Sequence, residues 1–251
     1  MINKIDVLIK GFPGTSNRTS LGMSSVTLIS ADDKNILIDT ASFGARGILI
    51  NELKKRNLSP LDIDMVLFTH LHFDHCANAD LFKNAKFVYS KQEWKYVNNE
   101  EDVYVQKPVI DMISKYDSIL IDDNQDVISE IKAYITPGHT PGCTTYVINY
   151  NNTLFAVAGD AIKNRVELFS GDVVMTYDKN ISKNSIFKIK NMVDKVIPGH
   201  DCILIVEDQN VIPEEDNILI LTFQEGLNVN NSRVANMSLS FEKDYNVGNE
   251  N

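Results

Sequence analysis

Short apolar runs alternate with turn-forming segments over the first forty or so residues of the chain. The runs are DVLIKGF, SSVTLIS and NILIDT, and the segments that separate them are PGTSNRTS and ADDK. Apolar runs of this length, bounded by clusters of Gly, Asp, Asn and Ser, are typical of β-strands joined by turns. We therefore expect the chain to begin with several short strands.

A helical period follows, and after it the strand pattern returns. In GARGILINELKKRNLS the apolar residues recur at helical spacing, and three basic residues near the C-terminal end favour the helix dipole. The order of several strands followed by a helix occurs twice along the chain. This order predicts an α/β protein in which two sheets pack face to face with helices outside. The later strands are DIDMVLFT, KFVYS, SILID, EIKAYITP, TTYVINY, TLFAVAGD, KVIPGHD and CILIVE, with a helical stretch near SKNSIFKIKNMVD.

The domain organisation follows from length and from the later segments. A chain of 251 residues suffices for one sizeable domain and is short for two. We assign residues 1–212 to this domain, with 91–117 as a mostly helical insertion that could cover a site. Residues 213–251 hold the strand NILILTF and an Asn-rich polar tail with a frayed end. An exposed NILILTF strand could pair with a second chain, so a homodimer is one expectation.

The charge balance narrows the classes of partner. Lys and Arg number 24 and Asp and Glu 34, so the net charge is −10. This balance disfavours nucleic acid as a partner, because phosphate backbones bind clustered Lys and Arg. It leaves room for a local cationic site made by metal ions. No segment approaches the roughly 18 consecutive apolar residues of a membrane helix, and the start lacks the pattern of a signal peptide, so we expect a cytoplasmic protein.

All five histidines lie in segments that suit metal ligands. His70, His72 and His75 share the string THLHFDH with Asp74, directly after a strand, and alternation on an extended chain projects the first two to one side. A single unsupported histidine is usually a surface or core residue. The others also stand where strands end, a common place for functional side chains: His139 in TPGHTPG, Asp160 in AGD and His200 in IPGH. The cluster therefore predicts a zinc-type site.

These motifs resemble the metallo-β-lactamase superfamily. THLHFDH matches its HxHxDH motif, and His139, Asp160 and His200 follow in the family's order, so the resemblance covers roughly residues 5–205. It implies an αββα sandwich with two mixed sheets and metals at one edge. The chain looks most like the small stand-alone hydrolases, which include metallo-β-lactamase domain-containing protein 1, the acyl-homoserine lactonases and glyoxalase II.

The resemblance also implies roles for individual residues. It assigns His70, His72 and His139 to a first metal and Asp74, His75 and His200 to a second, with Asp160 bridging both. The ions are expected to be zinc, with iron or manganese as alternatives. Asp39, at the end of NILIDT, is expected to hold a ligand histidine; the other interpretation is a simple turn aspartate.

The expected reaction is hydrolysis of a small molecule. A hydroxide bridging two ions would attack an ester, lactone or thioester carbonyl, with Asp160 holding both ions and Asp74 orienting the nucleophile. Lys163 stands where acyl-homoserine lactonases carry a carbonyl-positioning tyrosine, which weakens that assignment; Lys163 could instead bind an anionic group or be a surface lysine. Trp94 could form an apolar wall over the site or simply pack the insertion onto the sandwich.

Other activities stay open at this point. A metal-dependent endonuclease or phosphodiesterase acting on RNA ranks second, because the same kind of site cleaves phosphodiesters in relatives. Hydrolysis of β-lactams is less favoured, since the true β-lactamases generally lack a bridging aspartate. A diiron oxidoreductase is also less favoured, because that branch usually has glutamate at the position of His72. Cys76 and Cys143 match no ligand position and are expected to be small packing groups, with tuning of the site or sensitivity to oxidation as the alternative.

Overall fold

Two large β-sheets are built from successive parts of the chain, the first from β-strands nearer the N-terminus and the second from those that follow. The computed structural model describes residues 1–208 and 210–240. In the six-stranded sheet the strands follow the chain: β1 (Ile2–Ile9), β2 (Val26–Ala31), β3 (Lys34–Ile38), β4 (Met65–Leu67), β5 (Lys86–Ser90) and β6 (Ser118–Ile121). The seven-stranded sheet has the order β13 (Asn210–Pro213), β12 (Leu204–Glu207), β11 (Lys195–Pro198), β10 (Thr153–Gly159), β9 (Thr144–Tyr150), β8 (Ile131–Ile135) and β7 (Gln125–Ile128).

Both sheets are mixed, as expected. Strands β3 to β6 pair in parallel, whereas β1 and β2 pair antiparallel to their neighbours. In the second sheet only β10 and β11 pair in parallel. Parallel neighbours need crossover connections, and these hold several of the helices and loops described below.

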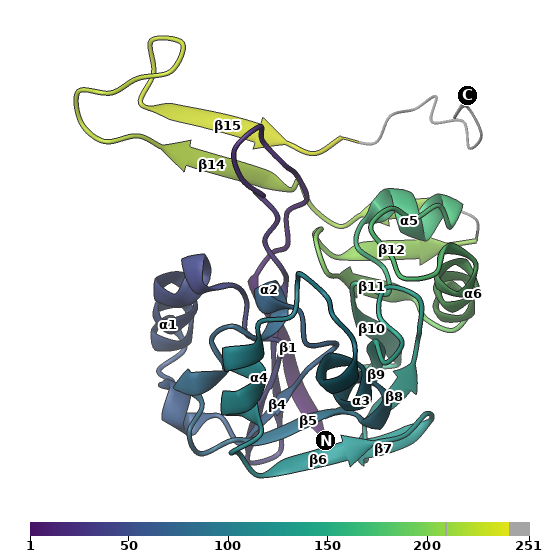
Figure 1. Ribbon diagram of the computed structural model, residues 1–251. Coiled ribbons are helices and arrows are strands. Elements are labelled where there is room, and N and C mark those ends of the chain that lie inside the picture. The colour runs from purple at the N-terminus through teal and green to yellow at the C-terminus, as the bar shows by residue number, and fades with distance from the viewer. Residues whose placement is uncertain (209, 241–251) are drawn as a thin grey trace.

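Helices lie outside the sheets (Figure 1). They are α1 (Arg46–Lys55), α2 (Phe73–Cys76), α3 (Lys91–Asn99), α4 (Lys107–Ile113), α5 (Arg165–Ser170) and α6 (Lys179–Lys190), with 3₁₀ turns η1 (Phe43–Ala45), η2 (Pro60–Asp62) and η3 (Ala79–Leu81). The insertion at 91–117 is therefore helical in two pieces, α3 and α4. Their apolar faces pack on the outer side of the first sheet.

Three apolar layers hold these elements together. The middle layer joins inward-facing residues of both sheets, such as Ile36 and Val88 with Tyr146 and Ile148. One outer layer packs α1, α3 and α4 on the first sheet, and the other packs α5 and α6 on the second. Strand residues that alternate between the two faces feed both an inner and an outer layer. This arrangement is the αββα sandwich.

The loops that carry the histidines leave the two sheets at the same end. THLHFDH follows β4 in the first sheet, and α2 begins directly after His72. In the second sheet, His139 follows β8, Asp160 follows β10 and His200 follows β11. Packing the sheets face to face therefore brings these segments together across the sandwich.

The C-terminal region differs from the expected strand and polar tail. Strand β14 (Ile218–Thr222) pairs antiparallel with β15 (Val234–Ser238), and this hairpin projects beyond the sandwich (Figure 1). The expectation of a tail was wrong for 234–238, because cross-strand pairing with β14 makes a strand of a sequence with little strand pattern of its own. The predicted frayed end falls largely in 241–251, outside the described residues.

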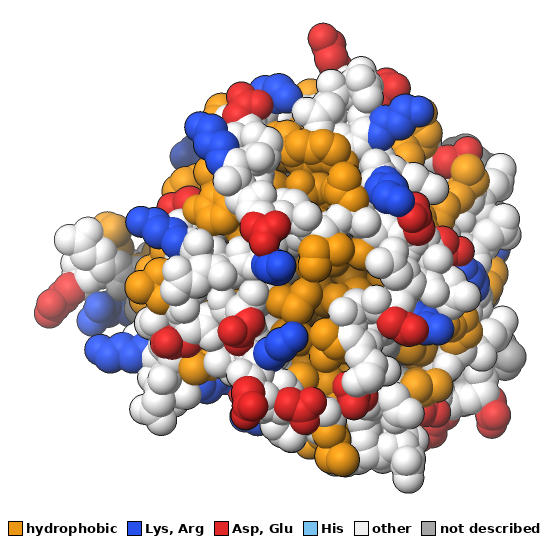
Figure 2. Space-filling model, turned by 90° about the horizontal axis from the view of Figure 1, so that it is seen from below, with side chains coloured by type: hydrophobic (Ala, Val, Ile, Leu, Met, Phe, Trp, Pro, Cys, Tyr) orange, Lys and Arg blue, Asp and Glu red, His pale blue; other side chains and the backbone are white. Residues whose placement is uncertain are grey.

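Charges are mixed on the end of the sandwich shown in Figure 2. Acidic and basic side chains alternate around a central apolar strip, and no histidine is visible on this face. Among the described residues, no helix is both long and apolar enough to cross a membrane.

Candidate metal centre

The structure brings together the whole set of side chains that the motifs single out. Three overlapping groups have ligand atoms that all lie within 4.8 Å of one another. They are His70 with His72 and His139, His70 with His75 and Asp160, and Asp74 with His75 and His200. The first and third groups match the two expected ligand sets.

Asp160 lies between the two sets. Its Oδ2 is 3.4 Å from Nε2 of His139, and its Oδ1 is 3.1 Å from Nε2 of His75. The same Oδ1 is 3.2 Å from Nε2 of His200. Each carboxylate oxygen therefore faces one group of histidines, as a residue shared by two ions would.

Each histidine has one ring nitrogen held by a neighbour on the outside of the cluster. The partners are a hydroxyl, two carboxylates and two backbone carbonyls: Thr69 Oγ1 for His70 Nδ1 (3.2 Å), Asp102 for His72 Nε2 (3.0 Å), Asp39 for His75 Nδ1 (2.8 Å), Met175 O for His139 Nδ1 (3.1 Å) and Met23 O for His200 Nδ1 (2.9 Å). A ring nitrogen that faces a carboxylate or carbonyl carries the proton. In those four histidines the opposite nitrogen is then a lone-pair donor aimed at the centre.

The arrangement of the donor atoms suits bound cations better than it suits hydrogen bonds among the donors. Nε2 of His70 is buried and has no hydrogen-bond partner among the described residues. Nε2 of His139 lies 3.0 Å from Nδ1 of His72, so two nitrogens that both point inward face each other. A cation at this point would satisfy both, whereas buried polar atoms without a partner are costly.

Burial and charge shift the pKa values of the clustered histidines in different directions. Burial lowers the pKa of His70 and His139 well below the usual value, which keeps both rings neutral. Burial would raise the pKa of Asp160, but the surrounding histidines, His200 first, bring it well below the ordinary range. Burial would also lower the pKa of His75 and His200, but neighbouring carboxylates, Asp160 first, raise it. Zinc requires neutral imidazoles around an ionised carboxylate, so these two rings would release a proton on binding metal.

Two glycines permit this close packing. A Cβ on Gly199 would lie 2.1 Å from Oδ1 of Asp160, and a Cβ on Gly159, whose φ is +49°, would lie 2.2 Å from Oγ1 of Thr69. Only glycine can occupy such positions without displacing its neighbours. This explains physically why the chain has Gly beside the functional residue in both AGD and PGH.

Asp39 is placed as the motif predicted. It is buried, has a left-handed φ of 61°, and its carboxylate accepts from the Thr69 amide and hydroxyl as well as from His75. It therefore fixes the strand end and one ring of the cluster at the same time. The interpretation as a simple turn aspartate does not explain these contacts.

The two expected substrate residues lie less centrally. Trp94 is half-buried against the outer apolar layer, with its ring 5.1 Å from that of Tyr89. Nζ of Lys163 lies 2.8 Å from Oε1 of Glu167, and the side chain is only 11% exposed. The lysine is thus a part-buried ion-pair partner and is not an ordinary surface residue.

Sequence reasoning missed two acidic residues. Asp102 holds His72 and also accepts from the Tyr96 hydroxyl, at 2.7 Å. Glu93 is buried and accepts from the amide of Leu71 and the hydroxyl of Thr140, so it joins the two histidine loops. Both come from the 91–117 insertion. Their only signal was an acidic residue within a helical segment, which a solvated helix face also shows.

Apolar side chains surround the His72 and His139 side of the cluster. The ring of Tyr104 is 5.6 Å from that of His72 and is 40% exposed, and Tyr177 beside His139 is 66% exposed. Met175 has a left-handed φ of 50°, unusual for a bulky residue, and this conformation points its carbonyl at His139. We call Tyr104, Met175 and Tyr177 the apolar rim.

The cysteines stay outside the donor set. Cys76, Cys143 and Cys202 are buried free thiols, and burial raises the pKa of Cys76 and Cys143 well above the usual value. A protonated thiol is a poor ligand and a poor nucleophile. The packing role expected for Cys76 and Cys143 agrees with their burial.

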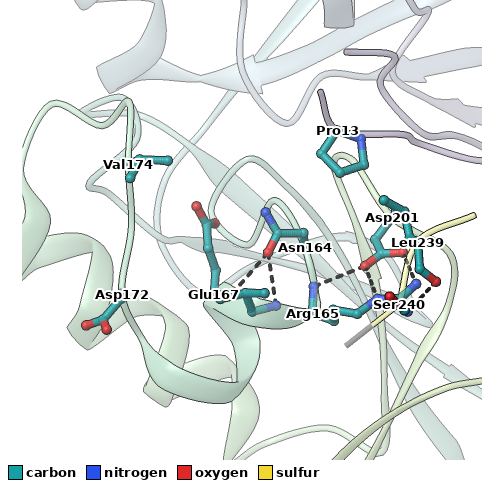
Figure 3. A pocket seen from close by; sticks show the side chains of 10 residues that line it. Pro13, Asn164, Arg165, Glu167, Asp172, Val174, Asp201, Leu239 and Ser240 are labelled. Atoms are coloured by element: carbon teal, nitrogen blue, oxygen red, sulfur yellow. Dashed lines mark hydrogen bonds and ion pairs between the residues drawn. The ribbon is translucent and has the colours of Figure 1, made fainter. Parts of the chain in front are cut away.

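A separate cavity of about 240 Å³ lies on the far side of Asp201, the residue after His200 (Figure 3). It is lined by Pro13, Asn164, Arg165, Val166, Glu167, Asp172, Val174, Asp201, Leu239 and Ser240. The seven clustered side chains do not line it. Figure 3 shows Arg165 and Asp201 joined by hydrogen bonds at its wall.

Comparisons with known proteins agree with the geometry. Residues 19–200 match the family model of the metallo-β-lactamase superfamily. A protein of Methanocaldococcus jannaschii named "Probable metallo-hydrolase" is 35% identical over 68% of this chain and 73% of its own length. An N-acyl homoserine lactonase of a Bacillus species is 26% identical over 61% of this chain and 62% of its own length.

Solved structures show the same fold. A dizinc quorum-quenching lactonase, AidC, in complex with a product, superposes with a TM-score of 0.66 and 22% identity over 78% of this chain and 81% of that one. The Bacillus thuringiensis lactonase AiiA, a variant with N-decanoyl-L-homoserine bound, gives 0.63 and 18% over 76% and 88%. With the fold, the motif segment and the donor geometry in agreement, the chain belongs to the metallo-β-lactamase superfamily of metal-dependent hydrolases.

Proposed function

We propose that the cluster holds two zinc ions and that the protein hydrolyses a small ester, lactone or thioester by attack at its carbonyl carbon. The observation that carries the proposal is the orientation of the histidines: four have their outer nitrogen fixed by a carboxylate or carbonyl, and His70 has its inner nitrogen buried without a partner. His70, His72 and His139 would bind one ion. Asp74, His75 and His200 would bind the other, with Asp160 shared.

Zinc is the metal that suits this donor set best. Each set combines neutral imidazoles with carboxylate oxygen, and thiolates are absent from both groups. Nitrogen and oxygen donors in sets of three or four are typical of catalytic zinc, and iron or manganese could bind the same donors. When bound, two such ions polarise a substrate carbonyl and supply hydroxide near neutral pH.

The chain's own residues then hold and orient the reacting groups. Asp160 links the two donor sets, because each of its two oxygens faces one of them. Oδ2 of Asp74 lies 3.5 Å from Nε2 of His200 and 3.8 Å from Nε2 of His75, at the open edge of the cluster. From there it can accept a proton from an attacking water and pass it to the departing oxygen or sulfur.

The substrate class rests on the surroundings of the cluster. The apolar rim beside His72 and His139 would cover an uncharged or acyl-bearing molecule, and large apolar side chains left this exposed are typical of binding surfaces. The lactonase relatives and neighbours act on acylated lactones according to their names. RNA is less favoured, because the chain has a net charge of −10.

The test is reconstitution with metal followed by a substrate screen. Chelated protein reloaded with zinc should bind two ions per chain and hydrolyse one of the lactones, esters or thioesters in a panel that also holds β-lactams, phosphodiesters and RNA. Asp160→Ala and His70→Ala should lose metal and turnover together. Full turnover by a metal-depleted variant, or activity on RNA alone, would refute the proposal.

A further inference from the structure

Asp201 directly follows His200 but belongs to none of the three ligand groups found among the described residues. Its side chain is fully buried and forms an ion pair with Arg165, whose side chain is only 6% exposed. The carboxylate accepts from Nε and Nη2 of Arg165, at 2.7 Å each, and from the Arg165 amide at 3.1 Å (Figure 3). Apolar residues of similar volume often stabilise a protein as well as a buried ion pair does, so stability alone does not explain this pair.

The ion pair connects two loops of the candidate metal centre. Arg165 begins α5, which follows the loop that carries Asp160, and Asp201 lies in the loop that carries His200. The backbones of these two loops are bonded to each other as well, since the His200 amide donates to the Lys163 carbonyl at 2.7 Å. Side-chain and backbone hydrogen bonds therefore hold the loop of His200 in place.

The ring of His200 is held by a second part of the chain. Its Nδ1 lies 2.9 Å from the Met23 carbonyl, and its Nε2 lies 3.2 Å from Oδ1 of Asp160. The Met23 carbonyl also accepts from the Phe12 amide, at 2.9 Å. The position of the ring therefore depends both on the loop that carries His200 and on the segment that includes Phe12 and Met23.

Asn217 joins these two parts of the chain. It is buried, and its Nδ2 donates to the Gly11 carbonyl at 2.8 Å and to Oδ1 of Asp201 at 3.2 Å. Gly11 directly precedes Phe12, and Asp201 directly follows His200. One side-chain amide thus connects the loop that carries His200 with the segment that holds its ring.

This amide comes from outside residues 19–200, the segment that matches the family model. Asn217 directly precedes β14, and its carbonyl accepts from the amide of Leu239, the residue after β15, at 2.9 Å. These bonds fix the base of the C-terminal hairpin to the loop of His200. Among the described residues, the C-terminal region supplies no side chain to the three ligand groups, so its connection to the metal centre is indirect.

We propose that Asp201 and Asn217 are positioning residues that hold His200 in the donor set of Asp74, His75 and His200. This inference rests on the proposed function, because it assumes that this set binds a metal ion. Groups that orient a metal ligand typically contribute roughly 10-fold to 100-fold in metal affinity. The other donor set is oriented by different groups, so losing Asp201 or Asn217 should weaken one ion and leave the other nearly unchanged.

The first test is calorimetric titration of the metal-free full chain with zinc. Wild type should bind two ions, and Asn217→Ala should weaken one of the two binding steps roughly 10-fold to 100-fold. The weakened step should be the one that His200→Ala also weakens. Asp201→Asn, which removes the charge and keeps the shape, should have the same selective effect. If Asp201→Asn does not fold because Arg165 is left unpaired, Asn217→Ala decides the outcome, since it removes only a neutral group.

Two control variants separate positioning from a general loss of stability. Asn35→Ala also removes an amide that donates to a backbone carbonyl, that of Asp62 at 3.0 Å, but Asn35 lies at the end of β3 opposite to Asp39. Ile189→Ala leaves a space in the buried layer between α6 and the second sheet. Both variants should bind two zinc ions as wild type does, even where their free energy of unfolding is lower.

The second test is NMR of the metal-free protein, which separates this inference from the proposed function. The ring N–H of His200, assigned by its loss in His200→Gln, should exchange with water faster in Asn217→Ala than in wild type or Asn35→Ala, because its hydrogen bond to Met23 loosens. Wild type that binds fewer than two ions would refute the proposed function, and the exchange rate would still show whether Asn217 holds the ring. An unchanged exchange rate in folded Asn217→Ala would overturn the inference, and so would zinc binding that is unchanged or equally weakened at both steps.

Discussion

Oδ2 of Asp102 lies 3.0 Å from Nε2 of His72, on the side of the ring that faces away from the other histidines. His72 is therefore the one histidine of the cluster whose inward nitrogen is Nδ1. The hydrogen bond from His72 is the largest cause of the lowered pKa of Asp102, which keeps this carboxylate ionised. It fixes the tautomer of His72 and the orientation of its ring.

Removing Asp102 should weaken metal binding. Asp102→Ala should lower zinc affinity roughly 10-fold to 100-fold, because the ring of His72 loses its orienting acceptor, and Asp102→Asn should lose less since its amide oxygen can still accept. Competition with a chromophoric chelator measures this. Tyr96→Phe removes only the hydroxyl that donates to Asp102 and should bind zinc normally; equal losses in both variants would assign the effect to packing.

Glu93 should matter for stability more than for chemistry. Glu93→Ala leaves the Leu71 amide and the Thr140 hydroxyl buried without an acceptor, so the free energy of unfolding should fall by about 3 kcal/mol. Glu93→Gln can accept from one group and donate to the other, and should cost about 1 kcal/mol or less. Urea unfolding of the metal-free variants measures both. A similar loss in the two variants would mean that the charge itself is required.

Glycine should be favourable for stability at the position of Met175. Its left-handed backbone costs a non-glycine residue about 1 kcal/mol, so Met175→Gly should be more stable than Met175→Ala by about this amount. Zinc content should stay the same in both, because the backbone carbonyl holds His139. Thermal unfolding of the two variants in parallel gives the comparison. A less stable glycine variant would show that the conformation is not strained.

Acid should remove the contribution of the Asp6–Arg56 ion pair to the free energy of unfolding. The hydrogen bond from Arg56 is the main cause that lowers the pKa of Asp6 from 3.8 to about 2, so the contribution is complete above about pH 4 and disappears as the pH falls through about 2. A shift of this size is worth about 2 kcal/mol, and solvent screening at this partly exposed site reduces it to about 1 kcal/mol.

The measurement compares wild type with Arg56→Gln in urea. Wild type should be more stable at pH 5, and the two curves should approach each other near pH 2. The comparison removes the effects of other carboxylates, which titrate in both proteins. A constant difference over this range would contradict the assignment, as would a difference that grows as the pH falls.

Most of the architecture could be read from the sequence. The strand runs SSVTLIS, NILIDT and TLFAVAGD became β2, β3 and β10, because apolar runs of this kind need a buried sheet whatever lies beyond them. The expected helix became α1, although Ile48 and Ile50 are exposed and only Leu49 and Leu53 of its apolar residues are buried. Strand β15 was missed because its pairing with β14 is a contact across a loop of eleven residues.

The candidate site divides in the same way. The sequence by itself determined the candidate donors, since His70, His72, Asp74 and His75 are neighbours in the chain and the other three residues follow strand ends in recognisable turns. Only the tertiary structure decided which groups orient these donors. Asp102, Glu93 and Met175 act through contacts from the insertion and a distant loop, and a hydrogen bond between remote segments leaves no period or spacing in the sequence.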